Sequence, residues 1–242
     1  MDITDQVALV TGANRGIGRR FVDELLERGA RKVYATARRT DSPEALELAS
    51  MDRMEVLRLD VTDHASVVDA ASTATDVTLL INNAGITTST PLVTGDPAGI
   101  RRELDTHFWG TLDVIRAFAP VLGANGGGAI VTVLSALSWF SFPGSGAYGV
   151  AKAAEWNMTN GVRLELASQG TLVQGVHLGA ADTDMMAGYD GPKIDPLLVA
   201  RASFDGLAAG AIEVVVDEWS AMVKASLAHD PADLYARIAP AS

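Results

Sequence analysis

Residues 7–18 read VALVTGANRGIG, a short apolar run followed by a turn that holds three glycines. After this turn, Ile17, Phe21, Leu25 and Leu26 are spaced like one face of a helix. Three glycines between a strand and a helix allow the backbone to approach a pyrophosphate, whose charge then lies at the helix N-terminus. The stretch predicts a nucleotide-binding strand, turn and helix. The alternative is a tight glycine turn without a ligand.

The rest of the chain continues this alternation of strand-length apolar runs and helix-length segments. Besides 7–10, we expect strands at residues 32–37, 54–59, 77–81, 129–134, 172–178 and 213–216. We expect helices at residues 63–75, 97–122, 146–168 and 196–211, and a last helix from Asp217. Alternating strands and helices form right-handed βαβ units. The sequence therefore predicts an α/β fold, a single Rossmann-like doubly wound parallel sheet with helices on both faces. No repeat or linker divides it, so we expect one domain over residues 1–242.

The composition excludes several classes of protein. Of 242 residues, 48% are hydrophobic and 20% charged, which is ordinary globular usage and excludes a disordered chain, a collagen and a coiled coil. The chain has no cysteine, which excludes disulfide scaffolds, thiol catalysis and cysteine-ligated zinc. Apart from His107, which is considered below, the histidines are His64, His177 and His229. They show no ligand spacing, so we expect no catalytic metal.

The charge and the first residues bear on partners and location. The formal net charge is −11, whereas a non-specific binder of nucleic acid or of an anionic membrane needs the opposite sign. The start, MDITDQVALV, carries an acid where a signal peptide needs a basic region. No apolar run approaches the roughly 20 residues of a membrane span. We expect a cytoplasmic protein with no nucleic-acid or membrane partner.

The end of the second expected strand indicates which nucleotide is bound. Sites that prefer NAD place an acid there for the ribose 2′-hydroxyl. In this chain Arg38 and Arg39 follow the strand, and Arg15 lies inside the glycine turn. The planar, paired donors of arginine suit a 2′-phosphate. The pattern favours NADP(H); the alternative is a solvated basic strand end.

Two further segments lie at the carboxyl ends of expected strands, where open α/β sheets bind ligands. Asp60 and Val61 follow the third strand, and the Asp60 carboxylate is placed to meet the adenine amino group. Asn83, Ala84 and Gly85 follow the fourth strand as a polar turn of small residues. Both segments are also ordinary loop formers.

The pattern Tyr148-x-x-x-Lys152 predicts the chemistry. Residues four apart lie on one face of a helix, so a Lys152 ammonium one turn from the Tyr148 phenol would lower its pKa from about 10 toward neutrality. Ser135 follows the expected fifth strand, so it lies at the carboxyl end of the sheet, as Tyr148 does. The two hydroxyl groups can then converge on one carbonyl oxygen.

In this order, TGANRGIG, LDV, NNAG, the Ser135 segment and YGVAK resemble the short-chain dehydrogenase/reductase family, over nearly the whole chain. The resemblance implies that Tyr148 is the general acid/base, that Lys152 binds the ribose and tunes Tyr148, and that Ser135 orients the carbonyl. It also implies that Gly179 and Thr183 contact nicotinamide. The expected cofactor contacts are Gly12, Asn14, Arg15, Gly16, Ile17, Gly18, Arg38, Asp60, Val61, Asn83, Ala84, Gly85, Tyr148, Lys152, Gly179 and Thr183.

The chain departs from the family pattern in three places. His107 occupies the position of the family's catalytic Asn, which holds a water in the proton relay, so His107 is either a relay residue or a satisfied core imidazole. Leu178 replaces the usual Pro of a Pro-Gly pair. The glycine-rich terminal segment of many tetrameric members is missing, which leaves a homodimer or a homotetramer open.

These expectations define an NADPH-dependent oxidoreductase that interconverts a carbonyl compound and its alcohol. If Trp139, Phe140 and Phe142 line the pocket, and Met185, Met186 and Tyr189 form a lid over it, the substrate is apolar or aromatic. The alternative for those residues is packing under a loop. Other readings of the chain are an imine or enoyl reductase on the same fold, and a non-catalytic NADP-sensing binding protein.

Overall fold

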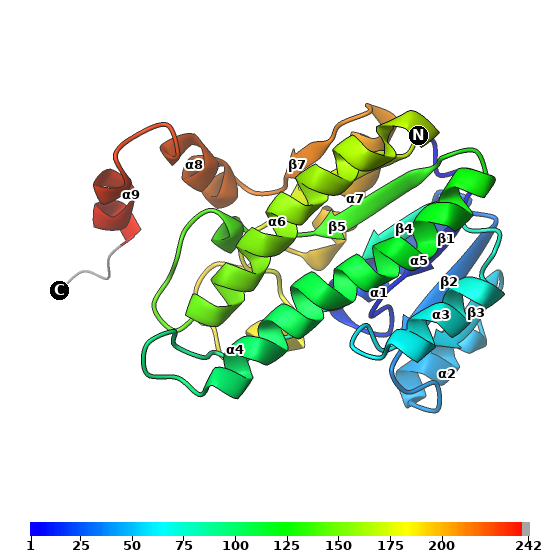
Figure 1. Cartoon of the computed structure of the whole chain (residues 1–242), viewed down its shortest axis with the longest axis horizontal. Coiled ribbons are helices and arrows are strands. Elements are labelled where there is room, and N and C mark those ends of the chain that lie inside the picture. The colour runs from blue at the N-terminus through cyan, green and yellow to red at the C-terminus, as the bar shows by residue number, and fades with distance from the viewer. Residues whose placement is uncertain (239–242) are drawn as a thin grey trace.

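The structure is a computed structural model and describes residues 1–238. Within these residues, seven parallel strands form one sheet in the order β3-β2-β1-β4-β5-β6-β7 (Figure 1). The strands are β1 (Val7–Val10), β2 (Lys32–Ala37), β3 (Met54–Arg58), β4 (Leu79–Asn82), β5 (Ala129–Val133), β6 (Leu172–His177) and β7 (Glu213–Val215). This confirms the predicted doubly wound parallel sheet. Strands β1, β4 and β5 are buried throughout, as expected for strands covered on both faces.

The helices cover both faces of the sheet. The helices of residues 1–238 are α1 (Gly16–Glu27), α2 (Pro43–Ala49), α3 (His64–Thr73), α4 (Pro97–Leu104), α5 (Thr111–Ala124), α6 (Gly146–Leu166), α7 (Pro196–Ala208), α8 (Glu218–Ser226) and α9 (Pro231–Ile238). Helices α2 and α9 were not predicted from the sequence. Helix α2 carries ordinary start signals, because the Ser42 hydroxyl accepts from the Ala45 amide and Pro43 is the first helical residue.

Alternate residues of each central strand face opposite halves of the core. In β1, Ala8 and Val10 pack with Phe21 of α1 in the half that α1 and α7 cover. Val7 and Leu9 pack in the other half, under α3, α5 and α6. Both halves are apolar and buried, so the sheet is held rigidly between two helical layers and presents its carboxyl-end loops as a fixed edge.

The expected single helix over residues 97–122 is interrupted, which corrects that prediction. A π-helix at Asp105–Gly110 joins α4 to α5 without changing the helical path visibly in Figure 1. Gly110 permits the close packing here, since a Cβ on it would meet the Val61 side chain and carbonyl oxygen at 2.9 Å. Such wide turns are rare and occur often at functional sites. Apolar periodicity continues through the segment, so the sequence does not reveal it.

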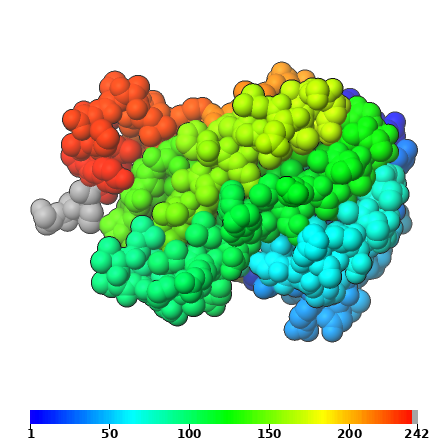
Figure 2. Space-filling model, in the orientation of Figure 1, coloured from blue at the N-terminus to red at the C-terminus, as the bar shows by residue number. Residues whose placement is uncertain are grey.

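The last two helices project from one end of the molecule, coloured orange to red in Figure 2. Val223 of α8 and Leu234 of α9 pack with Ala136 and Phe140, so this pair of helices covers the segment after β5. The Tyr235 hydroxyl accepts a hydrogen bond from the Ser141 amide in the same region. Among residues 1–238, no helix combines the length and the apolar character that crossing a bilayer requires.

Candidate active site

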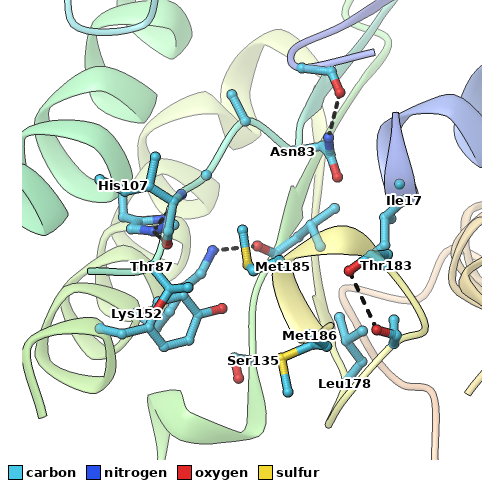
Figure 3. Close-up of a pocket in the computed structure, with 18 of the residues that line it drawn as sticks. Ile17, Asn83, Thr87, His107, Ser135, Lys152, Leu178, Thr183, Met185 and Met186 are labelled. Carbon is cyan, nitrogen blue, oxygen red and sulfur yellow. Dashed lines mark hydrogen bonds between the residues drawn. The ribbon is translucent and has the colours of Figure 1, made fainter. Parts of the chain in front are cut away.

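A cleft of about 400 Å³ lies at the carboxyl ends of the central strands. Its lining joins the turn after β1, the segments after β4, β5 and β6, the π-helix and α6. The residues that line it are Gly12, Arg15, Gly16, Ile17, Arg38, Asn83, Ala84, Gly85, Ile86, Thr87, His107, Val133, Leu134, Ser135, Tyr148, Lys152, Leu178, Gly179, Ala181, Thr183, Asp184, Met185 and Met186. Figure 3 shows His107 and Lys152 on one side of this cleft and Ile17 and Thr183 on the other.

The glycine turn has the geometry that a dinucleotide needs. Gly12 and Gly16 adopt the left-handed conformation, with φ of +64° and +54°, which favours glycine. The Asn83 side-chain amide donates to the carbonyl oxygens of Thr11 and Gly12, at 3.0 and 3.2 Å, and fixes the turn. No side chain caps the first turn of α1, so its amides are free to meet a phosphate. The turn therefore fits a nicotinamide dinucleotide.

Gly18→Ala tests the turn. A Cβ on Gly18 would overlap the Gly12 carbonyl oxygen and approach Asn83 Nδ2 to 2.5 Å. We expect a loss of about 1–3 kcal/mol in the free energy of unfolding, together with weaker cofactor binding. Urea unfolding and a fluorescence titration with NADPH measure both. Gly161→Ala in α6 is the matched control, because a Cβ there meets nothing within 4 Å, and it should leave both unchanged or raise stability slightly. Equal behaviour of the two variants would contradict the account of the turn.

The basic residues near the turn have different surroundings. Arg38 is exposed and lines the cleft just after β2. Arg15 also lines the cleft, and its guanidinium lies 3.6 Å from the Asp184 carboxylate across the opening. Arg39 instead points to Asp41, at 3.3 Å. Arg38 and Arg15 thus both line the cleft, and their contact with a ribose phosphate stays a prediction.

Ser135, Tyr148 and Lys152 meet in the same cleft. Ser135 lies two residues after the end of β5, and its hydroxyl accepts from the Leu137 amide at 3.1 Å, which starts a short 3-10 turn. Tyr148 is half-buried in the first turn of α6, and Lys152 lies one turn further, with its ammonium 5.8 Å from the centre of the Tyr148 ring. The Lys152 ammonium donates to the Val133 carbonyl oxygen at 2.8 Å. The three side chains come from two elements that pack closely.

The electrostatic environment of Tyr148 differs from the sequence prediction. Burial raises the pKa of the Tyr148 phenol, and Glu155 and Glu103 raise it further, whereas Lys152 and a hydrogen bond with Ser135 lower it; the net shift is upward from 10.0. Burial lowers the pKa of Lys152, but Glu155, Tyr148 and Glu103 together raise it above its ordinary value of 10.5, so the ammonium stays charged. The prediction that the phenol pKa falls toward neutrality is therefore wrong. The phenol stays protonated at neutral pH, in the form that donates a proton.

His107 lies in the π-helix and lines the cleft next to Tyr148. The imidazole is 1% exposed, and its ring meets the Tyr148 ring edge-on at 5.3 Å. Nε2 lies 2.9 Å from the Ile86 carbonyl oxygen and 3.4 Å from a Glu103 carboxylate oxygen. Gly85 makes room for the ring, since a Cβ there would come within 2.7 Å of it. His107 is therefore a buried cleft residue whose Nε2 is hydrogen-bonded, whereas its Nδ1 has no hydrogen-bond partner among residues 1–238. Its part in a proton relay stays a prediction.

His177 lies behind Ser135, at the end of β6. Its Nδ1 donates to the Ser135 carbonyl oxygen at 3.2 Å, and its ring stacks on Trp139 with centroids 4.0 Å apart. The side chain is fully buried, and burial lowers its pKa to about 4. His177 is thus neutral at neutral pH and supports the backbone that carries Ser135.

This environment predicts how stability depends on pH. In the unfolded chain His177 has its ordinary pKa of 6.5, so between pH 6.5 and about 4 the unfolded state binds a proton that the folded state does not. Stability contributed by this residue is therefore lost as pH falls through that window, by roughly 3 kcal/mol. Urea unfolding at both ends of the window should show this loss in the wild type and a smaller one in His177→Gln. The exposed His229 supplies the control, His229→Gln, which should keep the wild-type slope. A wild-type slope in His177→Gln would refute the assignment.

The structure brings together most of the predicted site residues. Asn14, Gly18, Asp60 and Val61 lie outside the cleft lining formed by residues 1–238. The Asp60 carboxylate accepts from the amide and hydroxyl of Thr62, at 3.0 and 2.8 Å, so it caps its own loop. Its contact with adenine stays a prediction.

Only some of the residues expected to form a pocket wall and a lid line the cleft. Trp139 stacks on His177, and Phe140 packs with Trp219 of α8, so both belong to the packing around the C-terminal helices. Met185 and Met186 do line the cleft.

Several lining residues were not identified from the sequence. Ile86 and Thr87 follow the predicted NNAG turn directly, and Leu134 directly precedes Ser135, so extending each motif along the chain finds them. Glu103 and Glu155 are buried beside the cleft and lie four residues before His107 and three after Lys152. That helical spacing is the signal that would have pointed to them.

Comparisons with known sequences identify the family. The family model for short chain dehydrogenases matches residues 6–192. An uncharacterized oxidoreductase of Staphylococcus aureus strain MW2 is 30% identical over 207 residues, which cover 83% of this chain and 90% of the relative. A short chain dehydrogenase of Monascus purpureus is 32% identical over 195 residues, covering 74% of this chain and 66% of that protein.

Solved structures agree as well. A short chain dehydrogenase from Burkholderia cenocepacia, solved in complex with NADP, is 40% identical, covers 100% of both chains and superposes with a TM-score of 0.93. A short-chain dehydrogenase from Streptomyces avermitilis is 27% identical and covers 97% of this chain and 98% of its own, with a TM-score of 0.84. The fold, the family match over most of the chain and these relatives place the protein in the short-chain dehydrogenase/reductase family of oxidoreductases.

Proposed function

We propose that the protein is an NADPH-dependent oxidoreductase that interconverts a carbonyl compound and its alcohol, as one domain acting in the cytoplasm. The observation that carries this proposal is the presence of Ser135, Tyr148 and Lys152 in the cleft that also contains the glycine turn. A protein that only sensed the nucleotide would need the turn but not the three reactive side chains. Their convergence therefore favours catalysis.

The residues act in a simple order. The bound nicotinamide cofactor would supply the hydride that reaches the carbonyl carbon. The Ser135 hydroxyl donates a hydrogen bond to the carbonyl oxygen and orients it. Tyr148 gives its phenolic proton to the same oxygen, which yields the alcohol and leaves a phenolate. The Lys152 ammonium, held on the same face of α6, stabilises that phenolate until it is reprotonated.

The lining of the cleft indicates the class of substrate. Beyond the glycine turn, the side chains near Ser135 and Tyr148 are mostly apolar: Ile86, Leu134, Leu178, Met185 and Met186. Thr87 adds a hydroxyl group. We infer a neutral, largely apolar carbonyl compound, because a charged acid would lose its hydration here without gaining a partner.

Arg38→Ala tests the preference for NADP(H). Arg38 lines the cleft at the end of β2, where no carboxylate is available for a ribose hydroxyl, and the Burkholderia cenocepacia relative binds NADP. Loss of a guanidinium paired with a phosphate should cost about 1.5–3 kcal/mol, more than tenfold in Kd for NADPH, with little change for NADH. Calorimetric titration of both cofactors measures the effect. Arg39→Ala, which removes the neighbouring guanidinium that points to Asp41, is the control. Equal affinity of the wild type for both cofactors would contradict the preference.

The reaction itself is tested by following NADPH oxidation over a panel of apolar ketones, cyclic imines and enones. The proposal expects turnover with ketones. Turnover confined to imines or to the enone double bond would support the alternative reductase activity. Tight NADPH binding with no turnover on any member of the panel would support a non-catalytic sensor.

A further inference from the structure

We propose that Glu155 is a positioning residue of this reaction: its buried carboxylate holds the Lys152 ammonium and limits how strongly that ammonium stabilises the Tyr148 phenolate. The inference rests on the proposed role of Tyr148 as proton donor. It concerns a residue outside the expected set of Ser135, Tyr148 and Lys152.

The Glu155 carboxylate is buried and is held in place through both of its oxygens. Its side chain is 1% exposed in the middle of α6, and one carboxylate oxygen lies 2.7 Å from the Lys152 ammonium. The other oxygen accepts from the Thr111 hydroxyl at 3.1 Å, from the first residue of α5. The Lys152 ammonium donates also to the Val133 carbonyl oxygen. Two of the three ammonium hydrogens are therefore committed, and one stays free for a sugar hydroxyl.

Other titratable groups surround this pair. His107 of the π-helix places Nδ1 3.9 Å from Glu155, and on its other side Nε2 lies 3.4 Å from Glu103 of α4. His177 of β6 is within the electrostatic influence of Lys152 and is neutral at neutral pH, because burial lowers its pKa to about 4. The phenol of Tyr148 thus has two buried carboxylates, Glu103 and Glu155, and one ammonium, Lys152, in its surroundings.

The consequence for Tyr148 follows from Coulomb's law. An ammonium near a phenol favours the phenolate, whereas a carboxylate next to that ammonium cancels much of its field at the ring. With Glu155 in place, the phenol keeps its proton at neutral pH and can act as an acid toward a carbonyl oxygen. Without the Glu155 carboxylate, its repulsion of the phenolate is gone and only Glu103 opposes the ammonium, whose charge Tyr148 and Glu103 still favour. The phenolate then forms at lower pH.

The test is an ultraviolet titration of tyrosinate absorbance in the protein without cofactor or substrate. The chain has four tyrosines, so the transition of Tyr148 is identified as the one that Tyr148→Phe removes. Glu155→Gln keeps the shape of the side chain and removes its charge. We expect the Tyr148 transition to move to lower pH by about one unit or more relative to wild type. An unchanged transition overturns the proposal.

Three further variants sharpen the result. Glu165→Gln, on the exposed face of the same helix, should leave the transition at the wild-type pH. Glu155→Asp, which keeps the charge, should restore most of the wild-type value. Thr111→Val removes the hydroxyl that holds the Glu155 carboxylate and keeps the size of the side chain at position 111. It should move the Tyr148 transition in the same direction as Glu155→Gln, by a smaller amount. If Glu155→Gln fails to fold, Thr111→Val becomes the test of the proposal. A Tyr148 transition at the wild-type pH in that variant overturns it. Because the titration involves no turnover, its failure is distinct from a failure to reduce ketones.

Discussion

Tyr148→Phe should lower turnover with a ketone substrate by roughly 10²-fold or more while NADPH still binds. The substitution keeps the ring, which meets His107 edge-on, and removes only the hydroxyl that donates the proton. The Lys152 ammonium and the glycine turn stay in place, so the cofactor site is preserved. Steady-state kinetics and a fluorescence titration with NADPH separate the two effects.

Tyr189→Phe is the matched control for this variant. Tyr189 is 41% exposed and lies a few residues beyond Met186, outside the lining of the cleft, so the loss of its hydroxyl should leave turnover near the wild-type value. Near-wild-type turnover in Tyr148→Phe would remove the phenol from the chemistry.

Lys152→Met should destabilise the protein by about 3–5 kcal/mol, because it leaves the Glu155 carboxylate buried without its partner. The two side chains are 5% and 1% exposed and lie 2.7 Å apart, so water cannot replace the lost ammonium. Activity should disappear as well, since nothing then stabilises the phenolate. Urea unfolding at neutral pH measures the change in stability.

The double variant Lys152→Met/Glu155→Met separates an unpaired charge from lost packing. Removing both charges leaves two side chains of suitable length and neither of the two buried charges, so most of the lost stability should return. Lys193→Met, which removes a lysine paired with the exposed Asp182, should change stability by about 1 kcal/mol or less. A double variant no more stable than Lys152→Met would show that the loss comes from packing alone.

The fold could be predicted from the sequence because its signals are local. A fully buried parallel strand reads as an apolar run, as residues 77–81 do, and the glycine turn marks where the first strand becomes a helix. The cleft could be predicted for a related reason. In an open parallel sheet the loops after the strands share one edge, so Gly12, Asn83 and Ser135 had to lie near one another.

What the sequence left undetermined depends on packing between distant segments. The π-helix that carries His107 forms where Gly110 packs against Val61, 49 positions earlier in the chain, and no local signal marks it. The charge balance around Tyr148 was predicted in the wrong direction for the same reason. The pattern Tyr148-x-x-x-Lys152 shows an ammonium near a phenol, but burial and the carboxylates of two helices decide the pKa.

The central claim is that the cleft carries hydride transfer to a carbonyl carbon with Tyr148 as the acid. Incubation of the protein with an apolar ketone and NADPH that carries deuterium at the transferable position of its nicotinamide tests this directly. Mass spectrometry of the product should show an alcohol with one deuterium on the carbinol carbon in the wild type, and at most a trace in Tyr148→Phe. Alcohol without deuterium at that carbon, or equal labelled product from both proteins, would contradict the account.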